Sequence, residues 1–196
     1  MIQLSKAEIE EIFNYLDNTK LHGDKSLFYK MQYYYARRSE EIAVLKVKDI
    51  DFDLNRITFN IAKKKDKTVK NVKLIPAVRN HLLEYIDEKG LDPEDFIFIE
   101  AEDGATEEEV KSKKDSLKRK LRMYLERNSC KITRELLGKE VKLNTHDFRR
   151  LRGQHMYLAG AKIEHLQELY QHIDINQTIT YLQIDEIIID NLLDNY

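Results

Sequence analysis

Four side chains in the last quarter of the sequence have types and spacing that suit chemistry on an anion. His146 and Arg149 are three residues apart, so they share one side at the start of a predicted helix. An imidazole and a guanidinium there lie near the positive end of the helix dipole and its free N–H groups, which favours anion binding. His172 follows at the end of the next predicted helix and Tyr181 nine residues later, so a compact three-helix segment can bring all four groups together.

Each of these residues also has a structural explanation when it is taken alone. A single histidine more often makes a structural hydrogen bond than a catalytic one. The chain has 11 tyrosines, most of which must serve the core or the surface. Only the combination therefore points to a site.

Three predicted helices position the four groups. Thr145 suits the N-cap of a helix that ends near Gly160, a second helix covers 162–170, and a short third helix covers about 176–181. The order of these elements predicts a compact helical unit around the candidate site.

A tail helix is expected over about 183–196. Ile184, Ile188 and Leu192 fall at steps of four, with Ile187 beside them, and acidic residues cover the opposite side. This apolar stripe suits either docking on a neighbouring molecule or packing on its own domain.

The rest of the chain predicts helices around a small antiparallel sheet. Ser5 and Glu8 form a capping-box pattern that starts the first helix, and helical periodicity then runs over 27–45. The sequence is therefore expected to fold as α+β, mostly α-helical. The elements expected next are strands over 56–61 and 69–75, a helix from Pro76 to Gly90, a short strand over 96–99, and a helix from Thr106 towards Arg127.

The composition limits the classes of protein that fit. With 196 residues, 42% of them hydrophobic, and only two prolines, the chain can bury the core of one domain. The single cysteine, Cys130, excludes a disulfide framework and a multi-cysteine zinc site. No apolar run approaches the roughly 18 residues of a membrane span, and no signal peptide opens the chain. We expect a soluble, cytoplasmic protein with no membrane partner.

The formal net charge is −2, so binding to nucleic acid must depend on local clusters of positive charge. Six lysines lie within 63–73, seven basic residues lie within 111–122, and three arginines lie within 149–152. Such runs are often only solvated surface, but they also suit the phosphates of DNA. The residues expected to contact DNA are Lys63, Lys64, Lys70, Lys118, Arg119, Arg122, Arg150 and Arg152.

The C-terminal combination closely resembles the signature of the tyrosine recombinases, the phage-integrase family. The family's pattern is His-x-x-Arg, then a histidine about 26 residues after the first, then a nucleophilic tyrosine nine residues further on. His146, Arg149, His172 and Tyr181 match it at each position. Agreement over this length, with similar hydrophobic residues between, is hard to obtain by chance.

Two upstream segments extend the resemblance. Arg38 and Glu41 match the family's arginine followed three residues later by an acid, whereas Arg37 is one place out of register. The lysine-rich turn resembles the family's catalytic-lysine hairpin, in which Lys67 is the match. Lys65 stays an alternative, because the gap from Lys67 to the following proline is one residue longer than usual.

The resemblance covers nearly the whole chain, so it implies that residues 1–196 form the catalytic domain of such a protein. Two glycines that are usual in the family are replaced by Ala36 and Gln171, neither of which supplies a reacting group. The family's usual N-terminal core-binding domain is expected to be absent. Either it has been removed or the protein is naturally minimal.

The resemblance implies that Tyr181 attacks the scissile phosphate and leaves a 3′-phosphotyrosyl link and a free 5′-hydroxyl. A tyrosine with a pKa near 10 is only about 0.1% ionised at neutral pH, so it needs help from its surroundings. Arg38 and Arg149 would bind the non-bridging oxygens and stabilise the transition-state charge.

The other residues take their implied roles from the same resemblance. His146 would assist proton transfer to or from the tyrosine, and His172 would donate a hydrogen bond to a non-bridging oxygen. Lys67 would protonate the departing 5′ oxygen, and Glu41 would support the arginines. No metal or other cofactor is implied.

The leading hypothesis is a site-specific DNA recombinase with an integrase role, acting as a homotetramer on paired sites of double-stranded DNA. One alternative is a monomeric enzyme like the type IB topoisomerases, and another is a catalytically silent DNA-binding protein of the same fold. The target sequence, the host element, and the choice between integration, excision, resolution and inversion are not readable from the chain.

Overall fold

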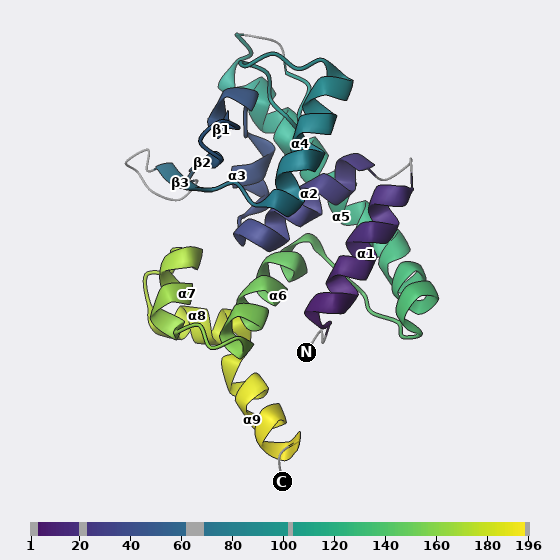
Figure 1. The fold of residues 1–196 in the computed structure, drawn as a ribbon, viewed down its shortest axis with the longest axis vertical. Coiled ribbons are helices and arrows are strands. Elements are labelled where there is room, and N and C mark those ends of the chain that lie inside the picture. The colour runs from purple at the N-terminus through teal and green to yellow at the C-terminus, as the bar shows by residue number, and fades with distance from the viewer. Residues whose placement is uncertain (1–3, 20–22, 62–68, 102–103, 195–196) are drawn as a thin grey trace.

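The computed structural model describes residues 4–19, 23–61, 69–101 and 104–194. This part of the chain is mostly helical and carries a small antiparallel sheet (Figure 1), so the predicted α+β class is confirmed. Its helices are α1 (Lys6–Asn18), α2 (Gly23–Tyr35), α3 (Ser39–Ala43), the 3₁₀ helix η1 (Val47–Asp49), α4 (Pro76–Lys89), α5 (Glu107–Leu137), α6 (Thr145–Leu158), α7 (Ile163–Tyr170), α8 (Ile175–Leu182) and α9 (Ile184–Asp194). Its strands are β1 (Ile50–Asp51), β2 (Arg56–Asn60) and β3 (Val69–Lys73).

Helix α1 begins as the sequence predicts. The backbone N–H of Ser5 donates to the Glu8 carboxylate at 2.7 Å, and the Ser5 hydroxyl accepts from the backbone N–H of Glu8 at 3.3 Å. These reciprocal bonds satisfy backbone groups that the first turn of a helix leaves without partners. The apolar side chains from Ile9 to Leu16 on one face of α1 are buried, which orients α1 on the core.

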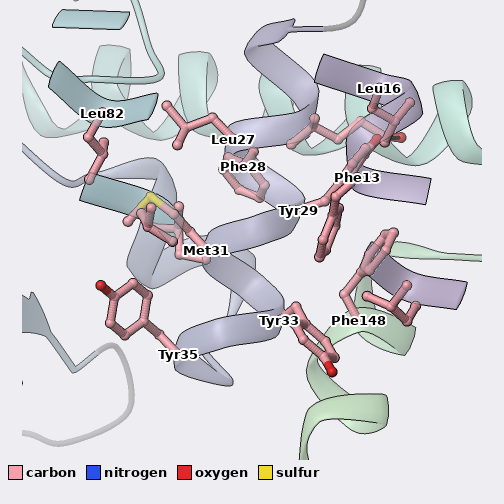
Figure 2. Packing of buried hydrophobic residues seen from close by; sticks show 14 of the residues in the cluster. Phe13, Leu16, Leu27, Phe28, Tyr29, Met31, Tyr33, Tyr35, Leu82 and Phe148 are labelled. Carbon is pink, nitrogen blue, oxygen red and sulfur yellow. Dashed lines mark hydrogen bonds between the residues drawn. The ribbon is translucent and has the colours of Figure 1, made fainter. Parts of the chain in front are cut away.

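The main core forms around α2. Phe13 of α1 and Tyr29 of α2 both stack on Phe148 of α6, with ring centroids 5.7 and 5.0 Å away (Figure 2). The Tyr29 hydroxyl donates to the carbonyl of Leu121 in α5 at 2.9 Å. This packing fixes α6, whose first turns carry two of the predicted site residues, against the N-terminal helices.

Strand β2 lies between β1 and β3, and both pairings are antiparallel. Ile57 pairs with Val72 and Phe59 with Lys70. Ile57 and Phe59 are buried, so this face of β2 covers the core. The two-residue strand β1 was not predicted, because so short a segment shows no alternation.

The strand predicted over 96–99 is wrong. In the described part of the chain this segment makes a single bridge, between Phe96 and Lys46. The facing chain turns into η1 directly after that bridge, so a ladder of hydrogen bonds cannot continue.

The continuous helix predicted over 27–45 is also wrong, because the chain breaks between α2 and α3. Ala36 has a φ of 50°, in the left-handed region that stops a right-handed helix. Its N–H donates to the carbonyl of Tyr33 at 3.2 Å, and Arg38 becomes the N-terminal cap of α3. The turn therefore ends α2 and places Arg38 at the start of α3.

Two other helix limits differ from prediction. Helix α5 continues past Arg127 to Leu137, where Gly138 with a φ of 66° forms the C-cap. Asn144, rather than Thr145, is the N-cap of α6, and its side chain accepts from the backbone N–H of His146 at 2.9 Å.

A second, smaller apolar cluster holds α7, α8 and the start of α9 against α6. Tyr170 and Leu182 are fully buried in it. A Cβ atom on Gly153 of α6 would lie 2.5 Å from the Tyr170 hydroxyl and 2.6 Å from a Leu182 methyl, so this close approach requires glycine. Helix α9 then extends away from the other helices (Figure 1).

Candidate active site

Two arginines far apart in the sequence meet at one carbonyl oxygen. Nη2 of Arg149 donates to the Tyr170 carbonyl at 3.1 Å, and Nη2 of Arg38 makes a longer contact with the same oxygen at 3.5 Å. Tyr170 is the last residue of α7, where backbone carbonyls lack partners within the helix and the helix dipole is negative. The end of α7 therefore gathers two guanidinium groups at one point.

A buried carboxylate orients Arg38. The backbone N–H and Nη1 of Arg38 each donate to Glu41 at 3.1 Å, and the Glu41 side chain is only 1% exposed. The Arg38 side chain is 17% exposed, so part of its fork stays open to solvent. This arrangement fixes the guanidinium and leaves donors for an anion.

Arg149 is held from two sides. Its guanidinium carbon lies 4.7 Å from the centre of the Tyr170 ring, and the Tyr170 hydroxyl donates to the Arg149 carbonyl at 2.5 Å. Burial lowers the pKa of Arg149, opposed by attraction to Tyr181. A guanidinium stays charged even so, and its charge acts in surroundings from which water is largely excluded.

Tyr181 lies in the last turn of α8, next to this arginine pair. Its ring centroid is 5.4 Å from that of Tyr170 and 5.5 Å from that of His172. The Tyr181 hydroxyl oxygen is buried and has no hydrogen-bond partner among the described residues. Burial raises the pKa of Tyr181, and the positive charges of Arg149 and Arg150 oppose the rise.

His172 follows directly after α7. Gln171 adopts a φ of 55°, which ends the helix in the left-handed conformation and turns the chain. Nδ1 of His172 lies 3.0 Å from the buried hydroxyl of Thr178. When that hydroxyl donates, the imidazole carries its proton on Nε2, which is then a hydrogen-bond donor.

His146 lies in the first turn of α6 with an exposed side chain. Partial desolvation and then the nearby Arg149 charge lower the pKa of His146. The imidazole is therefore neutral at pH 7, and a neutral imidazole can accept a proton.

The predicted basic residues fall into several environments. Lys63, Lys64, Lys65 and Lys67 lie outside the described residues. Lys70 of β3 pairs with Glu168 of α7 at 3.1 Å, and Lys118 of α5 pairs with Glu40 of α3 at 3.0 Å. Arg119 and Arg122 are exposed on α5, Arg150 pairs with Asp147 at 2.7 Å, and Arg152 lies over the rings of Tyr33 and Tyr34.

Three features of the site were not predicted from the sequence. Tyr170 organises both arginines through its carbonyl and its ring, but it was only one of many tyrosines. Gly153 permits its approach to α6, and a lone glycine within a helical pattern was the available signal. Arg37, set aside for its register, is buried close to the pair.

The candidate site does not coincide with the open pocket beside α5. A pocket of about 590 Å³ lies between α4, α5 and residues 95–101, and none of the predicted site residues lines it. Across the described ranges no three histidine, cysteine or acidic side chains gather as a metal site requires. Within the same ranges, no helix is long and apolar enough to cross a membrane.

The fold has clear counterparts among solved structures. The integrase of the Tn1549 transposon, in complex with transposon right-end DNA, has a TM-score of 0.69 and 16% identity, covering 92% of this chain and 61% of that one. XerH recombinase bound to its palindromic difH substrate has a TM-score of 0.67 and 20% identity, covering 97% and 52%. The catalytic domain of bacteriophage HP1 integrase has a TM-score of 0.52 and 17% identity, covering 92% and 86%.

These likenesses concern the fold, and this chain spans less than two thirds of the Tn1549 and XerH chains. No curated protein sequence matches it. The Phage integrase family matches residues 3–186, which is nearly the whole chain. The resemblance inferred from the spacing of the site residues is thereby confirmed, and the chain belongs to the Phage integrase family.

Proposed function

We propose that the protein is a site-specific DNA recombinase that cleaves and rejoins DNA through a 3′-phosphotyrosyl intermediate at Tyr181. The observation that carries the proposal is the meeting of Arg38 and Arg149 at the Tyr170 carbonyl, beside the buried Tyr181 hydroxyl. Two converging guanidinium forks suit the non-bridging oxygens of one phosphate. Membership of the Phage integrase family supports the same chemistry.

In this scheme the Tyr181 oxygen forms a bond to phosphorus while the bond from phosphorus to the 5′ oxygen breaks. The tyrosine proton passes to a base, for which neutral His146 is suited by its lowered pKa. Arg38 and Arg149 stabilise the negative charge that develops on the phosphoryl oxygens. His172, oriented through Thr178, donates to one of them.

The departing 5′ oxygen gains a proton, which we assign to Lys67, with Lys65 as the alternative. The phosphotyrosyl link conserves the energy of the phosphodiester, so the free 5′-hydroxyl of a partner duplex can attack it. The scheme needs neither ATP nor a metal ion for this exchange.

The substrate in this proposal is double-stranded DNA, bound by the basic residues around the site. Lys70, paired with Glu168, and Lys118, paired with Glu40 and Asp115, would exchange these partners for a phosphate. We place residues 1–196 as the catalytic domain, which the coverage of the HP1 catalytic domain supports. The enzyme would act in the cytoplasm, and integration is the role we favour.

The deciding experiment is covalent capture on nicked suicide duplexes from a random library, with EDTA present. Wild type should form a covalent protein–DNA adduct, and Tyr181→Phe should form none. Tyr15→Phe on α1, far from the site, is the matched control and should trap DNA as wild type does. Sequencing the trapped DNA would identify the target.

Two results would contradict the proposal. An adduct that survives in Tyr181→Phe would move the nucleophile elsewhere, and wild type that traps no DNA at low salt would favour a silent DNA-binding protein. The product of the reaction distinguishes a recombinase from a topoisomerase. A recombinase joins two duplexes, whereas a topoisomerase relaxes supercoiled DNA as a monomer.

A further inference from the structure

Arg37 is a buried charge that the proposed mechanism does not use. Its side chain is 2% exposed, and it is among the largest fully buried side chains of the protein. Its guanidinium carbon lies 5.4 Å from the centre of the Phe59 ring of β2. Within the described residues Arg37 makes no hydrogen bond and no ion pair, and its Nε is fully buried without a partner.

An arrangement of this kind opposes folding. A guanidinium carries five N–H donors, and each buried donor without an acceptor costs stability. Removing a charge from water without pairing it opposes folding, whereas burying an apolar side chain of similar volume does not. Contact with the Phe59 ring offsets only part of this cost.

The surroundings of Arg37 connect it with the candidate site. Burial lowers the pKa of Arg37, attraction to Glu41 opposes this, and repulsion from Arg149 and Arg38 adds to it. Glu41 already accepts two hydrogen bonds from Arg38. Arg37 therefore adds a third positive charge near two others, and it shares the negative charge of Glu41 with Arg38.

We propose that Arg37 is a positioning residue whose buried positive charge attracts and stabilises a DNA phosphate at the Arg38–Arg149 pair. This inference rests on the proposed function, because it takes DNA as the anion. In a region that excludes water, a charge acts over a longer distance than in solvent, so Arg37 contributes without touching the phosphate. The bound phosphate adds negative charge to a group of three arginines that share Glu41.

The test is the pair of variants Arg37→Met and Arg37→Lys, measured for stability and for single-turnover adduct formation on the duplex trapped by wild type. Arg37→Met should be at least as stable as wild type in urea, because it removes an unpaired buried charge. Its adduct formation at saturating DNA should fall about tenfold or more. Arg37→Lys should recover most of that rate, because it keeps the charge.

Arg79→Met is the matched control. Arg79 also lies over a phenylalanine ring, 5.8 Å from the Phe52 centroid, but it donates to Asn55 at 2.9 Å, and it is not among the charges that shift the pKa of Arg37. Its replacement should lower stability slightly and leave the rate of adduct formation unchanged.

Two outcomes would overturn the inference. A stable Arg37→Met protein with the wild-type rate would show that the charge is a bystander, and an Arg37→Met protein less stable than wild type would show that it serves the fold. Both presuppose that wild type forms the adduct and Tyr181→Phe does not. Loss of that difference would instead remove the proposed function, and with it the phosphate that Arg37 is proposed to attract.

Discussion

The Tyr170 carbonyl shows how one backbone atom can arrange side chains from distant parts of a chain. Arg38 and Arg149 have a common acceptor because α7 ends at that residue and leaves its last carbonyls without helical partners. The acceptor is neutral, so it aligns the two charges without cancelling them. A phosphate arriving there meets donors that are already oriented.

Some residues of the site could be predicted from the sequence and others could not. His146, Arg149, His172 and Tyr181 were predictable, because their spacing follows from short helices that are local in sequence. The importance of Tyr170 was not, since its contact with Arg38 joins positions 132 residues apart. Only the folded chain brings such positions together.

His155 gives a prediction at the same scale, on the dependence of stability on pH. Its Nε2 lies 2.7 Å from the Leu4 carbonyl and its Nδ1 lies 2.8 Å from the Tyr33 hydroxyl, which suits a neutral ring that donates through Nε2 and accepts through Nδ1. Burial lowers the pKa of His155, and the bond to Leu4 only partly opposes this.

A lowered pKa means that the unfolded chain binds the proton more tightly than the folded protein does. The contribution of His155 to the free energy of unfolding is therefore fully present above pH ~6.5, is lost as the pH falls below that value, and levels off below the folded pKa. Urea unfolding at a series of pH values should show a shallower decline between pH 7 and 5 in His155→Gln than in wild type. A slope in His155→Gln equal to that of wild type would refute the prediction.

At the scale of elements, the sequence predicted those helix ends that are formed by capping residues close to them in the chain. The structure confirms three of these ends: the capping box at Ser5, the start of α4 at Pro76 and its C-cap at Gly90. The end of α2 at Ala36 could not be predicted, because the residue in the left-handed conformation there is an alanine and not a glycine. The prediction of a strand over 96–99 was wrong for a related reason. A strand forms only beside a second strand, and the residues of 96–99 carry no information about that second strand.

Gly153 tests how tightly the elements of the site are packed. Glycine to alanine within a helix ordinarily stabilises a protein by about 1 kcal/mol. Here the added methyl would meet the Tyr170 hydroxyl at 2.5 Å and a Leu182 methyl at 2.6 Å. Gly153→Ala should therefore lower the free energy of unfolding, by about 1–3 kcal/mol, and reduce adduct formation by displacing α7 and α8.

A double-mutant cycle separates this packing from a general effect on α6. Leu182→Ala removes one of the two clashing groups, so the double variant should be destabilised by less than the sum of the single variants. Urea unfolding of the four proteins measures the difference. Additive effects would mean that the Gly153 methyl does not meet Leu182.

At the scale of the whole molecule, the tail helix divides its apolar residues between two roles. Ile184 and Ile187 are buried in the cluster that holds α8, whereas Ile188 and Ile189 are 41% and 55% exposed. The predicted stripe therefore packs partly on its own domain, and the side chain of Leu192 lies outside the described part. Helix α9, which carries this exposed pair, extends away from the other helices (Figure 1). We therefore expect the pair to contact a neighbouring protomer.

Replacing both exposed isoleucines by aspartate should separate assembly from chemistry. The double variant Ile188→Asp, Ile189→Asp should keep its stability and its adduct formation on a single site, because neither residue belongs to the buried cluster. Its multimers on paired DNA sites, measured by sedimentation, should be lost, since burying two carboxylates in an apolar contact is costly. Leu54→Asp, at a position 73% exposed in the turn after β1, should assemble as wild type does. If the double variant still forms multimers on DNA, protomers contact one another through a different surface, and α9 serves only the domain that carries it.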